Sequence, residues 1–248
     1  MREQIYAASD QDRAGKAAPE SDFKVSINDT LDGCIITKYS GTGGDVIIPA
    51  KIQGYPVKEI SGRAFVDCCS LTLAAIPDSV TLIGSGAFSG CDNLTSVAIP
   101  YGVTLIGRYA FQGCGSLASV AIPYGVTAIG EAVFLGCSNL ASVTIPDSVT
   151  LIGVGTFMGC RSLASVTIPD SVTLIGEWAF SKCASLVSVA IPDSVTQIGR
   201  GAFRDCSSLV TVDIAPINRK WGKDSFSGCK LSLASQAALK RAGYTGGF

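Results

Sequence analysis

The cysteines are the residues whose type and spacing most suggest chemistry. Eight of the ten follow a phenylalanine by three residues and recur every 23 residues. Such a set offers disulfides, metal binding or buried thiols. Zinc sites use pairs such as Cys-x-x-Cys, whereas this chain offers only the adjacent Cys68-Cys69. Each of these cysteines occupies the same inward position of its repeat, where a small apolar thiol fits. The sequence therefore predicts a column of buried, reduced thiols: Cys68, Cys91, Cys114, Cys137, Cys160, Cys183, Cys206 and Cys229.

A second column consists of carboxylates. Asp147, Asp170 and Asp193 each follow a proline at the same position of the repeat. Carboxylates stacked about 5 Å apart repel one another unless a cation or hydrogen bonds intervene, so a calcium site is conceivable. The Pro-Asp-Ser sequence also forms Asx-type turns without metal. We favour the turn, and expect neither a metal nor a cofactor.

Catalytic groups are scarce. The chain has no histidine, which removes the commonest general base and metal ligand. It shows no Ser-His-Asp, Cys-His, paired-carboxylate or phosphate-loop arrangement, and its many serines follow the repeat. The 19 basic and 20 acidic residues form no cationic stripe along the repeats. We therefore expect no enzymatic activity, no catalytic residues and no nucleic-acid partner.

Two tyrosines are the strongest candidates for recognition. Tyr101 and Tyr124 follow the proline in neighbouring repeats, where other repeats have aspartate. Aromatic residues of this kind are enriched at binding hot spots. We expect a partner-binding patch that also includes the outward residues Ala98, Ala121 and Thr144. The alternative is that both rings merely cover turn backbone.

A stripe of leucines is a second candidate surface, for self-association. Leu82, Leu105, Leu151 and Leu174 stand between inward positions, with Ala128 in register. Val80, Leu82 and Ile83 cannot all point inward from one regular strand, so the leucines are either exposed or tucked in by a bulge. Both alternatives stay open. The segment 72–175 carries only seven charged residues, which favours association over repulsion.

These residues depend on repeated elements for their positions. Six prolines recur at the same 23-residue step, at 77, 100, 123, 146, 169 and 192, which indicates a solenoid. Leu94, Val97 and Ile99 suit a short inward strand, and stacked copies predict a parallel sheet as the concave wall. Proline ends each strand, and Ala87-Phe88 opens a turn that places the ring inside.

The two ends depart from the repeat, as terminal repeats commonly do. We expect a disordered arm over residues 1–22, a capping β-hairpin over 23–48, the solenoid over 49–229 and a C-terminal cap over 230–248. The cap contains a helix, for which Ser235 is the predicted N-cap and Gly243 the stop.

Neither a membrane span nor a signal is visible. Serine, threonine, glycine or proline interrupts every apolar run well before about 18 residues. The first ten residues lack the apolar stretch of about 7 or more that a secretory signal contains.

The repeat Leu-x-Ser-Val-x-Ile-Pro-Asp-Ser-Val-Thr-x-Ile-Gly-x-x-Ala-Phe-x-x-Cys resembles the treponemal-type, or BspA-like, bacterial leucine-rich repeat. The resemblance covers the chain from about Phe23 onward. It implies a right-handed, β-rich horseshoe with a concave parallel sheet, an N-terminal hairpin cap and a C-terminal helical cap. The tyrosines after proline and the leucine before Ile-Gly depart from the family's pattern.

The resemblance also implies a non-catalytic protein-binding or adhesion module. Its partner would be a host extracellular protein or a bacterial surface protein, bound through the concave face. The usual location of the family's members favours a secreted, periplasmic or surface-associated protein, whereas the predicted unpaired thiols favour a reducing compartment. The alternative function is binding of a small hydrophobic ligand or lipid at exposed apolar surface.

Overall fold

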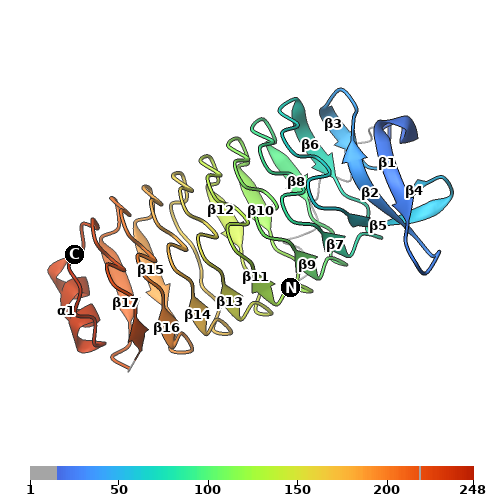
Figure 1. Ribbon diagram of the computed structural model, residues 1–248. Coiled ribbons are helices and arrows are strands. Elements are labelled where there is room, and N and C mark those ends of the chain that lie inside the picture. The colour runs from blue at the N-terminus through green and yellow to red at the C-terminus, as the bar shows by residue number, and fades with distance from the viewer. Residues whose placement is uncertain (1–15, 218) are drawn as a thin grey trace, which may run out of the picture.

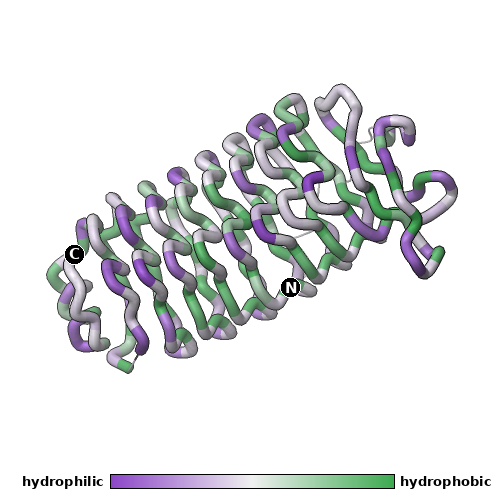
Figure 2. Tube along the Cα trace, viewed as in Figure 1, coloured by the Kyte–Doolittle hydropathy of each residue, from purple (hydrophilic) through white to green (hydrophobic). Residues whose placement is uncertain are grey.

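The computed structural model describes residues 16–217 and 219–248, which form a solenoid between a β-hairpin and a helix (Figure 1). Each regular coil has three sides, namely two short strands and one turn that carries the phenylalanine. Hydrophobic residues recur at the same places in successive coils (Figure 2). The predicted leucine-rich-repeat solenoid is confirmed, because like residues of consecutive coils pair at the 23-residue step.

The first side, which we call the Val sheet, is the parallel sheet that the sequence predicted. Its strands pair in register, for example Val120 with Val143, and its valines point inward. Hydrogen bonding divides it into three segments, with an isolated bridge between Ser165 and Ser188. Its strands are β3 (Gly44–Ile47), β6 (Leu71–Ala75), β8 (Ser96–Ala98), β10 (Ser119–Ala121), β12 (Ser142–Thr144), β15 (Ser188–Ile191) and β17 (Thr211–Ile214).

The second side, the Ile sheet, is also a parallel ladder. Each strand is two residues long in the regular coils, with a buried isoleucine second and its neighbour facing outward. A turn after proline separates the two sheets; Val80 N–H, for example, donates to Pro77 C=O at 3.0 Å. The strands are β5 (Tyr55–Ile60), β7 (Leu82–Ile83), β9 (Leu105–Ile106), β11 (Ala128–Ile129), β13 (Leu151–Ile152), β14 (Leu174–Ile175), β16 (Gln197–Ile198) and β18 (Lys220–Trp221).

The Ile sheet is interrupted between β9 and β11. Strands β7 and β9 pair, as do β11 and β13, but no backbone ladder joins β9 to β11 in the described residues. Gly130 N–H has no backbone partner there, whereas the equivalent Gly153 N–H donates to Ile129 C=O at 2.7 Å. The two coils still join through the turn side, where Phe111 N–H donates to Val133 C=O at 2.9 Å.

The third side is a turn that buries one phenyl ring per coil. Neighbouring rings lie 4.8 to 5.6 Å apart and nearly parallel, so they form one stack through the core. Tyr39 continues the stack at one end, 4.9 Å from Phe65, and Tyr244 closes the other end, edge-on to Phe226 at 5.5 Å. The stacked residues are Phe65, Phe88, Phe111, Phe134, Phe157, Phe180, Phe203 and Phe226.

The predicted hairpin is present at the N-terminal end. Strands β1 (Phe23–Ile27) and β2 (Cys34–Tyr39) pair antiparallel, and β2 then pairs in parallel with β5. A short strand, β4 (Lys51–Ile52), folds back on β5. The hairpin thus covers the open edge of the Ile sheet, as a solenoid end requires.

The predicted disordered arm requires a correction. Residues 1–15 lie outside the described part of the chain. Residues 16–22 contact the first coil and include a 3₁₀ turn, η2 (Glu20–Asp22). Ala18 N–H donates to Ile47 C=O at 2.9 Å, and the Glu20 carboxylate accepts from Gln53 N–H at 2.8 Å. Sequence reasoning missed these contacts because the segment has no apolar periodicity and is held through polar groups. The other domain boundaries remain predictions.

The C-terminal helix α1 (Leu233–Arg241) covers the other end and contacts β17. Its N-cap is Ser232, whose hydroxyl accepts from Ser235 N–H at 3.2 Å, so the predicted N-cap was wrong by one turn. The Ser235 hydroxyl instead accepts from Val212 N–H and so holds the helix against the Val sheet. Gly243 ends the helix with a φ of +86°, as predicted.

Close contact between coils at glycine leads to a testable prediction. A Cβ on Gly153 would lie 2.7 Å from the carbonyl carbon of Gly130, where backbone meets backbone. We expect Gly153→Ala to lower the free energy of unfolding by about 3 kcal/mol, because the coils must move apart. Urea denaturation followed by circular dichroism measures this change.

The interruption of the Ile sheet supplies a matched control for this substitution. A Cβ on Gly130 would meet its nearest atom at 3.9 Å. We expect Gly130→Ala to leave the free energy of unfolding unchanged or to raise it by up to about 1 kcal/mol, through the entropy of the unfolded chain. Equal losses in both variants would contradict the proposed origin of the effect.

Candidate binding surfaces

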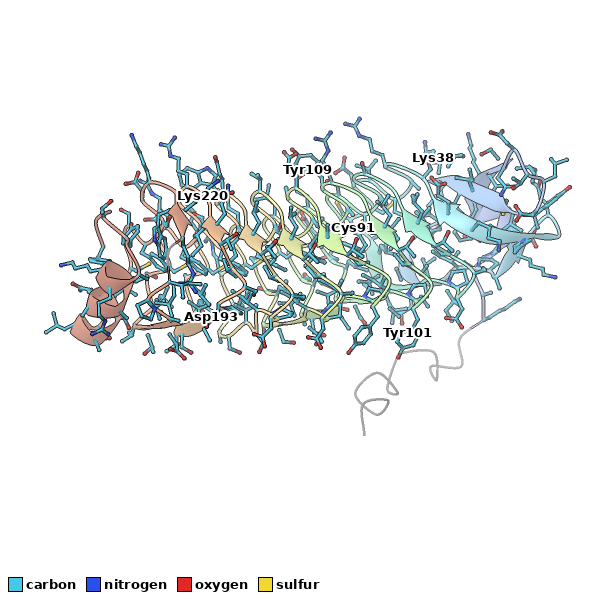
Figure 3. The ribbon with its side chains drawn as sticks, turned by 90° about the horizontal axis from the view of Figure 1, so that it is seen from below. Lys38, Cys91, Tyr101, Tyr109, Asp193 and Lys220 are labelled. Carbon is cyan, nitrogen blue, oxygen red and sulfur yellow. The ribbon has the colours of Figure 1, made fainter. Side chains whose placement is uncertain are left out.

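The turn after proline forms one long edge of the solenoid. Tyr101 and Asp193 lie along this edge, whereas Tyr109 lies on the opposite edge and Cys91 between them (Figure 3). Tyr101 and Tyr124 are 61 % and 54 % exposed, so two aromatic residues reach the surface in adjacent coils. Large aromatic side chains of this exposure retain apolar area that a partner can cover.

The tyrosine turns differ from the aspartate turns in their hydrogen bonds. In three of the four aspartate turns the serine hydroxyl donates to a valine carbonyl of the preceding coil, as Ser148 does to Val126 at 2.8 Å, whereas the Ser194 hydroxyl has no partner. Gly102 and Gly125 replace this serine in the two tyrosine turns and cannot make the bond. The two coils therefore lose an inter-coil bond exactly where they present aromatic rings, which weighs against a purely structural reason for the Tyr-Gly pair.

The remaining residues of the predicted patch lie on the outward face of the Val sheet. Ala98 and Ala121 are half-buried and Thr144 is exposed, at equivalent positions of β8, β10 and β12. Ala121 pairs directly with Thr144. The predicted set therefore occupies three successive coils, with the tyrosines at the turn that ends two of them.

The leucine stripe faces outward along the Ile sheet. Each leucine precedes a buried isoleucine in a regular two-residue strand, so no bulge tucks it inside. Leu105 is 52 % exposed, and Leu82, Leu151 and Leu174 are half-buried. Of the four leucines, Leu174 lines an open pocket of about 400 Å³, together with Gln197, Lys220 and Trp221.

The aspartates after proline do not gather into a metal-binding group. The side chains of Asp147 and Asp170 are exposed, and the turn is closed without them by backbone and serine hydrogen bonds. Asp193 lies 3.6 Å from the buried guanidinium of Arg219, which also donates to the Val195 carbonyl at 2.9 Å. Within residues 16–217 and 219–248, no three acidic or thiol side chains are arranged to hold a metal ion.

Comparison with known proteins connects this geometry to a family. The family model for the BspA type leucine rich repeat region matches residues 58–184 and 127–236, with six copies of the repeat. The chain belongs to this family. Proteins of the BspA type are typically non-enzymatic protein-interaction modules, so the absence of a recognisable catalytic arrangement in the sequence agrees with the family.

Two solved structures extend the comparison to the BspA-type fold. A leucine rich repeat protein of T. pallidum is 33 % identical, with a TM-score of 0.70 over 94 % of this chain and 99 % of that one. A leucine-rich repeat protein of Bacteroides ovatus is 26 % identical, with a TM-score of 0.58 over 85 % of this chain and 68 % of that one. A comparison with curated proteins gives no match. Among the described residues, none of the helices is long and apolar enough to span a bilayer.

The thiol column of this BspA-type chain lies inside the solenoid, as predicted. From Cys91 to Cys229 each thiol is buried and donates to the phenylalanine carbonyl of the preceding coil, as Cys137 does to Phe111 at 3.1 Å. Burial raises the pKa of Cys91, Cys137 and Cys183 to about 12. Cys68 is half-buried and Cys69 is exposed at the N-terminal end. The column thus serves packing and hydrogen bonding between coils.

Sequence reasoning missed a polar cluster across the interruption of the Ile sheet. The Glu131 carboxylate accepts from the Tyr109 hydroxyl and from Arg108, whose Nη1 lies 3.1 Å away. The hydrogen bond from Tyr109 is the main cause that holds the pKa of Glu131 below its usual value. Side-chain bonds thereby join β9 and β11 where the backbone ladder does not. The available signal was in the sequence, since Tyr109 is the only tyrosine at this position of the repeat and Glu131 follows it by 22 residues.

Proposed function

We propose that this BspA-type protein binds a protein partner through Tyr101, Tyr124 and the adjoining outward face of the Val sheet. The observation that carries the proposal is the pair of rings, each more than half exposed, in neighbouring coils. Exposed aromatic anchors are the usual centre of a protein interface. Host extracellular proteins and bacterial surface proteins are the partners that the family favours.

The surroundings of the tyrosines support a protein partner. The segment 72–175 carries seven charged residues, so the patch has few charges to desolvate when a partner covers it. Ala98 and Ala121 beside the rings are small, so a partner can approach the sheet closely. The leucine stripe is a second apolar surface, and we propose it for self-association or for a hydrophobic ligand.

Substituting both tyrosines by aspartate tests the proposal with little risk to folding. Tyr101→Asp with Tyr124→Asp restores the Pro-Asp sequence found after Pro77, Pro146, Pro169 and Pro192. Proteins retained by the immobilised chain are identified from a host matrix extract and a bacterial surface extract, and the dissociation constant is measured with the purified partner. We expect the double variant to bind more than tenfold more weakly, since each hot-spot residue contributes about 2 kcal/mol or more.

A leucine variant separates the two surfaces. Leu105→Asp leaves the tyrosines intact and places a charge in the middle of the leucine stripe. An unchanged dissociation constant for the tyrosine double variant, at an unchanged melting temperature, would overturn the proposal. If only Leu105→Asp weakens the complex, the partner binds the Ile sheet instead.

A further inference from the structure

Trp178 occupies a backbone position that suits glycine. The residue two places before each stacked phenylalanine has a left-handed φ in every coil; it is glycine in three coils and Arg63, Tyr109, Ala132, Trp178 or Asp224 in the other five. Trp178 adopts a φ of 58° there. A bulky residue in this conformation costs about 1 to 2 kcal/mol, and such strain is typical of functional positions. The core does not require this ring, because it lies at the surface, half-buried.

The indole ring of Trp178 lies over the turn of the next coil. A Cβ on Gly201 would be 2.4 Å from its Cζ3, so only glycine at that position lets the ring approach. The guanidinium carbons of Arg200 and Arg204 lie 5.5 and 5.7 Å from the ring centroid. Cation–π contact of this kind restrains both arginines beside one aromatic ring.

The two guanidinium groups are only weakly matched by carboxylates. Within the described residues Arg200 forms no ion pair. Arg204 Nε lies 3.6 Å from Asp205 Oδ2, which is too far for a hydrogen bond, and the side chains of Arg204 and Asp205 are both partly exposed. Lys182 lies in the same turn as Trp178, and Lys223 in the coil after Arg200. The Ser181 hydroxyl is buried without a hydrogen-bond partner. Planar guanidinium groups with unused N–H donors recognise oxyanions such as carboxylates.

We propose that Trp178, Arg200 and Arg204 form a binding site for an acidic polysaccharide whose carboxylates are separated by neutral sugars. The guanidinium groups bind a carboxylate, and the exposed part of the indole contacts the apolar face of a sugar ring. Glu177, Asp205 and Asp224 stand among the four cations and repel a densely charged polymer, so widely spaced carboxylates fit best.

Hyaluronan oligosaccharides, which carry one carboxylate on every second sugar, are the probe for this site. Calorimetry with the full chain measures the dissociation constant, and quenching of tryptophan fluorescence reports contact with Trp178. We expect Arg200→Gln with Arg204→Gln to weaken binding at least about tenfold, as the loss of charge-assisted hydrogen bonds requires. Trp178→Gly should weaken binding several-fold and abolish the quenching, without lowering the melting temperature, because glycine suits the left-handed position.

Controls separate this site from simpler explanations and from the tyrosine patch. Tyr101→Asp with Tyr124→Asp should bind hyaluronan like the wild type, so the two proposals fail independently. Neutral dextran should not bind. Absence of hyaluronan binding, equal binding by the double arginine variant, or tighter binding of polyglutamate, heparin or single-stranded DNA than of hyaluronan would each overturn the proposal.

Discussion

Raising the pH from 8 to 10 is expected to unfold this protein through its buried thiols. Burial raises the pKa of Cys91, Cys137 and Cys183 to about 12, and raises that of Cys114 and Cys160 as well. In the unfolded chain a thiol titrates near pH 8.5. Above that pH the unfolded state loses protons that the folded state keeps, so stability falls as pH rises.

The expected size of this effect follows from the number of thiols. Each contributes about 1.4 kcal/mol per pH unit once its unfolded form is ionised. Five such thiols together lower the free energy of unfolding by about 7 kcal/mol per pH unit, against a total of about 5 to 15 kcal/mol for a typical domain. The stabilisation is complete below pH 8 and is lost between about pH 9 and 12.

Urea denaturation at half-unit steps from pH 7.5 to 9.5 measures the slope before lysine and tyrosine titrate. Cys137→Ala is the matched variant: it should be less stable at every pH, but its pH slope should be smaller by about 1.4 kcal/mol per pH unit, because one buried thiol is gone. A stability that stays flat up to pH 9.5 would show that the thiols are not held protonated in the core.

Removing the ring of Phe134 is expected to be the most destabilising single substitution within the core. This ring is fully buried, with the rings of Phe111 and Phe157 each 5.6 Å away. We expect Phe134→Ala to lower the free energy of unfolding by about 4 kcal/mol, because it removes buried apolar area and leaves a cavity between two coils. Calorimetry and urea denaturation measure the loss.

The position of Phe134 near the middle of the stack adds a second expectation. Contacts in a solenoid run only between neighbouring coils, so a mid-stack cavity weakens the coupling between the two halves. Hydrogen exchange should show the coils on the two sides of Phe134→Ala opening separately. Phe134→Leu, which keeps most of the apolar volume, should cost less than half as much and preserve one cooperative transition. Equal losses for both variants would contradict the role of the ring stack.

The period of the sequence was sufficient to predict the core. Phenylalanine, cysteine and the inward aliphatic residues recur every 23 positions. A chain with such a repeat buries its apolar side chains when like residues of consecutive coils stack on one another. The parallel Val sheet, the hairpin, the helical cap and the buried thiols were therefore predictable. The N-cap was placed one turn late because Ser232 and Ser235 are equally good candidates until the docking of α1 on β17 distinguishes them.

Sequence alone could not decide which surface residues act together. The outward orientation of Leu105 depends on the two-residue length of β9, and the interruption beside it is defined by the missing backbone pairing between β9 and β11. Trp178 meets Arg200 and Arg204 only because the next coil places Gly201 beneath the ring. Periodic apolar burial is encoded locally and repeated, whereas contacts between unlike side chains of neighbouring coils depend on distances that only the folded chain defines.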